Sequence, residues 1–190
     1  MDKAIIQQQA KEAARGSRGS FGFLYDTYID EVYRFVYYKV HHQQQAEDIT
    51  ADVFTKAYEK ISSFDPNKAS FRTWIYMIAR TTIIDHYRTS KSASSIEDAW
   101  DVASDTDLGK EVGDKLDVSY LQPYLSQLSA GQREILMLRL WQDMSYKEIA
   151  EILGKSEASC KMAFSRSLKK LKDIMPISLL ISFLITKIVI

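Results

Sequence analysis

The chain of 190 residues is poor in the residues that interrupt helices and in the residue that forms disulfides. It contains seven glycines, three prolines and one cysteine. So few turn-forming residues argue against a hairpin-rich β protein and favour helices. A single cysteine excludes a disulfide framework and fits a reducing compartment. The first twenty residues are polar and lack the apolar run of a secretory signal, so we expect a cytoplasmic protein.

The sequence also lacks the patterns that carry catalysis. Its three histidines and Cys160 do not have the spacing of metal ligands, and no glycine-rich phosphate loop is present. We therefore expect no enzyme activity, no metal ion and no cofactor.

Charge is segregated along the chain, although the formal total is zero. Residues 93–118 hold eight acidic and two basic side chains, whereas residues 155–172 hold six basic side chains and one acidic one. Residues 68–91 are also basic, with five cations and one aspartate. The neutral total therefore hides two basic segments with an acidic one between them, and this asymmetry is more informative than the total.

Residues 145–171 have the pattern of two short helices joined by a tight turn, and the second helix is basic. Ser145 and Glu148 have capping-box spacing, and Gly154 can adopt the left-handed conformation that ends a helix. Ser156 then begins a second helix, whose apolar residues recur at helical spacing. Such a helix-turn-helix places its second helix in the major groove of DNA. The alternative is a helical hairpin with a solvated basic face.

Helical periodicity and composition predict an all-α protein of two small domains joined by an acidic linker. In the first domain we expect helices near residues 21–40, 46–61 and 71–89. The expected order is a polar, frayed leader at 1–20, the first domain at 21–90, the acidic linker at 91–118, the helix-turn-helix domain at 119–173 and a hydrophobic tail at 174–190.

The third expected helix, FRTWIYMIARTTIIDHYR, interleaves aromatic residues with arginines. Bases of a single strand can stack on rings such as Trp74, Tyr76 and Tyr87 while cations follow the backbone. Aromatic residues at helical spacing are also typical of a core. Both interpretations stay open from this segment alone.

Two segments together resemble the bacterial extracytoplasmic-function (ECF) sigma factors of the sigma-70 family. Residues 46–88, which read AEDITADVFTKAYEKISSFD and then FRTWIYMIARTTIIDHYR, resemble region 2. Residues 128–171, LSAGQREILMLRLWQDMSYKEIAEILGKSEASCKMAFSRSLKKL, resemble region 4. The resemblance implies a subunit that binds core RNA polymerase and directs promoter-specific transcription initiation. The alternative is a helix-turn-helix regulator that binds duplex DNA without polymerase, which would need no melting helix.

The resemblance implies that the helix start at residues 46–54 docks on the coiled coil of the largest polymerase subunit. Three acidic anchors are supported by three apolar residues: Glu47, Asp48 and Asp52 with Ile49, Val53 and Phe54. An acidic start also favours the helix dipole, so a solvated helix end is the plainer interpretation.

The loop and the third helix would open the −10 element of the promoter and read it as a single strand. A base must leave the stack before its Watson–Crick edge can be read. The residues implied for this contact are Asp65, Pro66, Asn67, Lys68, Arg72, Trp74, Arg80, His86 and Arg88. The alternative for Trp74 is a place in the core, and Asp85 is expected to orient an arginine.

The basic helix would read the −35 element as duplex DNA. The residues implied for this contact are Ser156, Glu157, Ser159, Lys161, Arg166, Lys169 and Lys170. Ala163 and Leu168 stand where the family usually has arginines. An arginine bidentate to guanine contributes about 1–3 kcal/mol of discrimination, so we expect a weaker or differently specified −35 contact. Cys160 stands at a core position and is expected to act as a small hydrophobic residue.

Two segments fall outside these contacts. Residues 91–118 are either a solvated spacer or a linker that follows a positively charged path through polymerase. ISLLISFLITKIVI, at residues 177–190, would be about 21 Å long as a helix, short of the roughly 30 Å hydrocarbon core. We expect this tail to pack on protein or to associate with a membrane. An anti-sigma factor is a further expected partner, although no residue identifies one.

Overall fold

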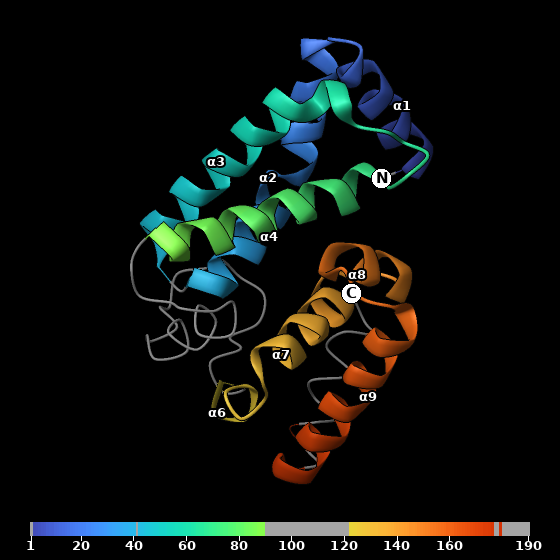
Figure 1. The fold of residues 1–190 in the computed structure, drawn as a ribbon. Helices are drawn as coiled ribbons and strands as arrows, with labels where there is room; N and C mark the ends of the chain where they lie inside the picture. Colours follow the sequence, from blue (N-terminus) through green and yellow to red (C-terminus); the bar gives the residue numbers. More distant parts are fainter. Residues whose placement is uncertain (1, 41, 90–121, 177–178, 180–190) are drawn as a thin grey trace. The chain divides into compact units, whose positions relative to one another are not determined.

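The computed structural model describes residues 2–40, 42–89, 122–176 and 179. Within these residues all regular structure is helical, and the chain divides into two compact units, Met1–Thr106 and Asp107–Ile190 (Figure 1). The all-α expectation is therefore confirmed. The acidic linker at 91–118 lies outside the described residues, as does most of the hydrophobic tail. Among the helices that the structure describes, none is long and apolar enough to cross a membrane.

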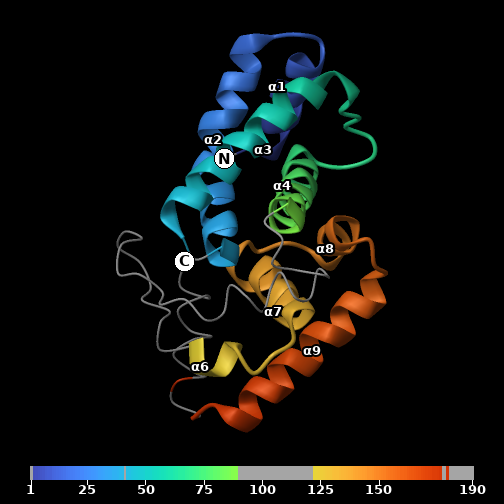
Figure 2. The ribbon, with the colours of Figure 1, turned by 60° about the vertical axis from the view of Figure 1, so that its left-hand side comes forward.

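Among its described residues, 2–40 and 42–89, the first unit contains the helices α1 (Lys3–Ala14), α2 (Arg18–Val40), α3 (Gln43–Lys60) and α4 (Phe71–Thr89) and the short 3-10 helix η1 (Ile61–Ser63). Figure 2 shows α2, α3 and α4 from a second direction. The expected helix at 71–89 has the predicted bounds, and the other two begin three residues earlier than predicted. Aromatic and aliphatic residues from all three helices form the core, with Phe35, Ile75 and Tyr76 fully buried.

The prediction of a frayed leader is wrong for residues 3–14, which form α1. Asp2 caps this helix by accepting a hydrogen bond from the backbone N–H of Ala4. Ala10 and Ala13 lie on one side of α1 and are buried, and α1 packs on α2, η1 and α4. Alanine makes only a weak hydrophobic pattern in a polar sequence, yet its small side chain lets two helices approach closely. The burial of α1 is therefore decided by its neighbour and not by its own composition.

The second unit contains the predicted helix-turn-helix. Its elements are α6 (Gln122–Leu125), α7 (Ala130–Leu136), the π-helical segment η4 (Met137–Trp141), α8 (Tyr146–Leu153) and α9 (Glu157–Ile174). The predicted capping box of Ser145 with Glu148 is present, and Ser129 with Gln132 forms a second one at the start of α7. Gly154 ends α8 at φ 63° in the left-handed region, as its position predicted.

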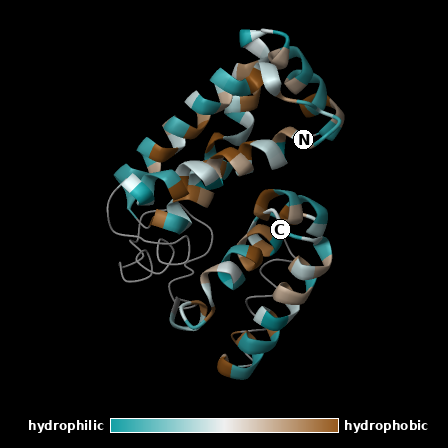
Figure 3. Ribbon diagram, viewed as in Figure 1, coloured by the Kyte–Doolittle hydropathy of each residue, from teal (hydrophilic) through white to brown (hydrophobic). Residues whose placement is uncertain are grey.

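The core of the second unit joins α7 to the C-terminal end of α9. Leu128, Leu136, Leu171 and Met175 form a buried cluster, and Phe164 and Leu168 of α9 pack against it. Figure 3 shows apolar and polar residues alternating along α9, as expected for a helix that packs with one face. Leu179, which belongs to the hydrophobic tail, also packs against this cluster.

Candidate functional site

The acidic start of α3 has an open face and a buried face. Glu47, Asp48 and Asp52 are exposed. Ile49, Val53 and Phe54 are buried in the core of the first unit, so they hold the helix and do not themselves form an outer surface. Glu47 accepts a hydrogen bond from the amide of Gln43 at 3.0 Å. The three carboxylates are therefore exposed on a helix whose opposite side is buried in the core of the unit.

Local hydrogen bonds to Asp65 fix the conformation of the loop before α4. The side chain of Asp65 accepts a hydrogen bond from the backbone N–H of Asn67 at 2.9 Å, and its carbonyl accepts one from Lys68 at 3.1 Å. Phe64 is buried beneath the loop. The side chains of Asn67 and Lys68 remain exposed, and the Lys68 ammonium lies 3.9 Å from the Asp65 carboxylate. The hydrogen-bonded backbone of the loop thus presents the exposed side chains of Asn67 and Lys68 to solvent.

Helix α1 supports this loop directly. The amide of Gln7 donates a hydrogen bond to the carbonyl oxygen of Pro66 at 3.0 Å, in a partly buried position. Gln7 was missed in the sequence because a glutamine in a polar helix has no distinguishing pattern. Its partner lies 59 residues away along the chain.

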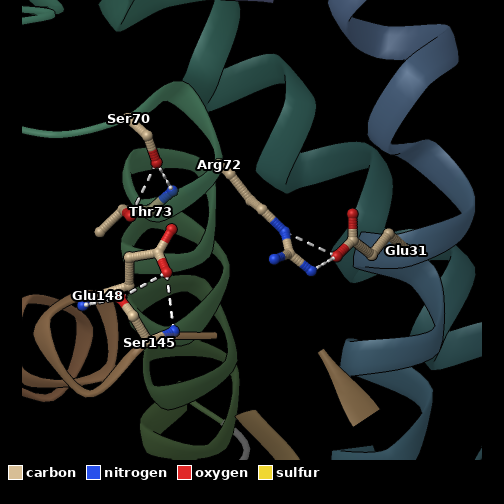
Figure 4. A network of polar contacts seen from close by, with 6 residues as sticks. All are labelled: Glu31, Ser70, Arg72, Thr73, Ser145 and Glu148. Atoms are coloured by element: carbon tan, nitrogen blue, oxygen red, sulfur yellow. Dashed lines mark hydrogen bonds and ion pairs between the residues drawn. The ribbon is translucent and has the colours of Figure 1, made fainter. Parts of the chain in front are cut away.

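Two polar contacts fix the start of α4, one within the helix end and one to α2 (Figure 4). Ser70 accepts a hydrogen bond from the backbone N–H of Thr73 and so caps the helix, as capping serines do. Arg72 forms an ion pair with Glu31 of α2, with its Nε donating at 2.9 Å. Both side chains are largely buried, so the guanidinium predicted to contact DNA is held within the protein.

The aromatic residues of α4 differ in their burial. Tyr76 is fully buried and Tyr87 is nearly so, which favours the core interpretation for both rings. The hydroxyl of Tyr87 donates to the carbonyl of Lys39, and burial raises the pKa of Tyr87 to about 12. Trp74 is half-buried, with its ring centroid 5.4 Å from Phe64. Trp74 is therefore part core and part surface.

The remaining predicted residues of α4 are accessible to different degrees. Arg80 and His86 are half-buried, whereas Arg88 is exposed. The expectation that Asp85 orients an arginine is wrong, because its carboxylate lies 4.0 Å from the ammonium of Lys56 on α3. The same lysine donates to the Thr82 hydroxyl, so Lys56 joins α3 to α4.

The N-terminal residues of α9 and its cap, residues 156–159, are exposed. Ser156 caps the helix by accepting from the backbone N–H of Ser159 at 3.2 Å. The predicted −35 residues are all exposed: Ser156, Glu157, Ser159, Lys161, Arg166, Lys169 and Lys170. Lys170, at the far end, also donates to the backbone carbonyl of Gln127.

The inward face of α9 explains one departure from the family pattern, Leu168, and includes the core position of Cys160. Leu168 packs on the core, and Cys160 is fully buried, as expected for a small hydrophobic residue. Burial raises the pKa of the Cys160 thiol. Met162 was missed by the sequence reasoning, and it is 55% exposed on this helix.

Comparison with known proteins identifies both units. The family model of sigma-70 region 2 matches residues 24–93, and that of sigma-70 region 4 matches residues 119–171. The ECF RNA polymerase sigma factor BldN of Streptomyces coelicolor is 31% identical over 180 residues, which cover 92% of this chain and 67% of BldN. The RNA polymerase sigma factor YlaC of Bacillus subtilis is 32% identical over 82% of this chain and 91% of YlaC.

A solved structure supports the fold. The sigma factor RpoE from Bartonella quintana, in complex with the anti-sigma factor NepR, superposes with a TM-score of 0.64 at 23% identity, and covers 80% of this chain and 94% of that chain. A regulator that acts without polymerase is not favoured, because the match includes region 2 as well as the helix-turn-helix region. The chain therefore belongs to the ECF RNA polymerase sigma factors of the sigma-70 family, and it directs promoter-specific transcription initiation by RNA polymerase.

Proposed function

We propose that this sigma factor divides promoter recognition between its two units. The acidic face of α3 binds core RNA polymerase, the loop at residues 65–68 captures the melted −10 strand together with α4, and α9 reads the −35 element as duplex. The protein acts in the bacterial cytoplasm, where RNA polymerase works.

The polymerase contact is carried by the division of α3 into a buried and an exposed face. Ile49 and Val53 are almost completely buried, whereas Asp48 and Asp52, which directly precede them in the chain, are exposed. A charged group on a rigid element keeps its geometry on binding and loses little conformational freedom. An acidic row of this kind is complementary to a basic surface on the polymerase.

The −10 contact is supported by the exposed side chains of a braced loop. The amide of Asn67 can donate to and accept from the edge of a base that has left the stack. Lys68 and Arg88 are exposed cations that can contact phosphate oxygens. Arg72 has a different role in this proposal, because its ion pair with Glu31 positions the beginning of α4.

The −35 contact is supported by the exposed N-terminal half of α9. The first residues of a recognition helix contact base edges, and cations farther along contact the phosphate backbone. Lys161 lies in the second turn, and Arg166 and Lys169 follow on exposed positions.

The relative RpoE was solved with the anti-sigma factor NepR, and this supports a similar partner for the present chain. A protein that covers the exposed faces of α3 or α9 would keep the free sigma factor from polymerase or from DNA. Co-purification of the full chain with proteins from its host, followed by competition with core polymerase, tests this extension.

The main test is reconstituted transcription with core polymerase and the full chain. A double variant, Asp48→Ala with Asp52→Ala, should weaken binding to core polymerase at least ten-fold, since each charge at an interface contributes on the order of 1 kcal/mol. Binding should be measured by titration of labelled sigma factor with core enzyme.

Glu59→Ala is the matched control, because Glu59 is an exposed acid on the last turn of the same helix. It should leave core binding unchanged. The proposed contact is wrong if the double variant binds core polymerase as the wild type does, or if Glu59→Ala weakens binding equally.

A further inference from the structure

Met162 is a large apolar side chain that the protein leaves uncovered. It is 55% exposed, and among residues 122–176 it is the exposed large hydrophobic residue. The residues two positions before and after Met162 are covered by protein, because Cys160 is fully buried and Phe164 packs on the core cluster. Cys160, Ser167 and Leu171 are the buried residues of α9, and helical spacing puts Met162 on the opposite face, where its side chain is available for a contact outside the unit.

The position of Met162 on α9 points to the DNA side. The helix begins at Glu157, so Met162 is its sixth residue and lies about 9 Å along the axis from the capped end. The major groove is about 8.5 Å deep and admits the beginning of such a helix. Ala158, one turn earlier, is exposed, and the cations of Lys161 and Arg166 flank the same surface. This charge makes DNA the occupant that fits best.

We propose that Met162 contacts the C5-methyl group of a thymine in the −35 duplex and so sets a preference for thymine at that base pair. The thymine methyl is the apolar group that the major groove displays, and it distinguishes T·A from the other pairs. A thioether side chain is flexible and adapts to such a small apolar surface. This inference rests on the proposed function of α9 and adds a base preference to it.

The contact would act on specificity and not on general affinity. Lys161 and Arg166 supply the salt-dependent attraction to phosphates, which is similar for every sequence. Burial of one methyl group against Met162 should change affinity about four-fold at a single base pair. The slope of binding against salt should stay the same, because no charge changes.

The test uses the holoenzyme formed from core polymerase and the full chain. Duplexes are first selected from a random DNA pool, and each thymine of the enriched −35 element is then replaced in turn by deoxyuridine, which lacks only the methyl group. With the wild type, one replacement should weaken binding about four-fold. With Met162→Ala the same replacement should have no effect, because the side chain that contacts the methyl is absent.

Two further variants separate this inference from the proposed function. Lys161→Ala should weaken binding to all duplexes and lower the salt slope, and Ser165→Ala, an exposed neighbour, should leave the uracil effect intact. If Lys161→Ala behaves in this way but no uracil replacement matters, the methyl contact is wrong and α9 remains the −35 reader. If Met162→Ala instead weakens binding to core polymerase, Met162 is a protein contact and the inference is overturned. If neither Lys161→Ala nor Met162→Ala changes DNA binding, the proposed function of α9 fails as well.

Discussion

The two units hold their candidate contact residues in different ways. In the first unit, side chains from other helices hold the candidate contact residues in place. Glu31 of α2 forms an ion pair with Arg72, and Gln7 of α1 donates a hydrogen bond to the backbone carbonyl of Pro66. In the second unit, Lys161 and Arg166 are both exposed on α9. The geometry of the candidate site in the first unit therefore depends on tertiary contacts, whereas that of α9 depends on which positions of one helix face solvent. A base that has left the stack is held by a preformed pocket, whereas a base pair in duplex DNA is recognised by a helix that enters the major groove.

The largest expected difference between the two units is in how much alkaline pH lowers their free energy of unfolding. The first unit buries Tyr76 and Tyr87, and burial raises the pKa of Tyr87 from 10.0 to about 12. Between these values the folded state keeps a proton that the unfolded state has lost. The free energy of unfolding is therefore unaffected below pH 10 and falls as pH rises towards 12, by up to about 3 kcal/mol.

Circular dichroism and tyrosinate absorbance during urea unfolding at pH 8 to 11.5 would measure this loss. Tyr87→Phe should reduce the dependence, because phenylalanine does not ionise, whereas buried Tyr76, whose pKa is also raised by burial, still contributes. A slope that is the same in Tyr87→Phe and in the wild type would contradict the assignment to Tyr87.

The second largest effect should distinguish two arginines. Arg72→Ala leaves the largely buried carboxylate of Glu31 without its guanidinium, so it should lower the free energy of unfolding by about 2 kcal/mol. Arg166→Ala removes an exposed side chain and should change stability by less than about 0.5 kcal/mol while weakening duplex binding. Urea unfolding and duplex titration give both quantities. Unchanged stability in Arg72→Ala, with weaker binding to −10 single strands, would instead make Arg72 a DNA contact.

The smallest effect should come from the support of the loop by α1. Gln7→Ala removes one hydrogen bond to the Pro66 carbonyl, worth about 1 kcal/mol, and should weaken holoenzyme binding to a promoter with a pre-melted −10 element up to about five-fold. Gln8→Ala is the control, because Gln8 donates to Glu12 on the exposed side of the same helix. Equal binding by both variants would show that the loop keeps its shape without α1.

The features that could be predicted from the sequence depend on residues close together in the chain. Ser145 and Glu148 are three residues apart, and the capping box follows from that spacing alone. Gly154 ends its helix because glycine adopts the left-handed conformation without steric cost. The burial of Cys160 and Leu171 follows from a 3.6-residue period. The residue-level contacts with polymerase and DNA remain predictions until the variants above are measured.

The sequence by itself determined the helical class, the helix-turn-helix and the family, because capping, turns and periodic faces are set within a few residues of the chain. Only the tertiary structure decided that α1 belongs to the first unit, that Arg72 is paired with Glu31 and that Tyr87 is buried while Met162 is exposed. Those outcomes join residues as far apart as Gln7 and Pro66. Their physical cause is packing between helices, where the partner decides whether a glutamine, an arginine or a tyrosine faces protein or water.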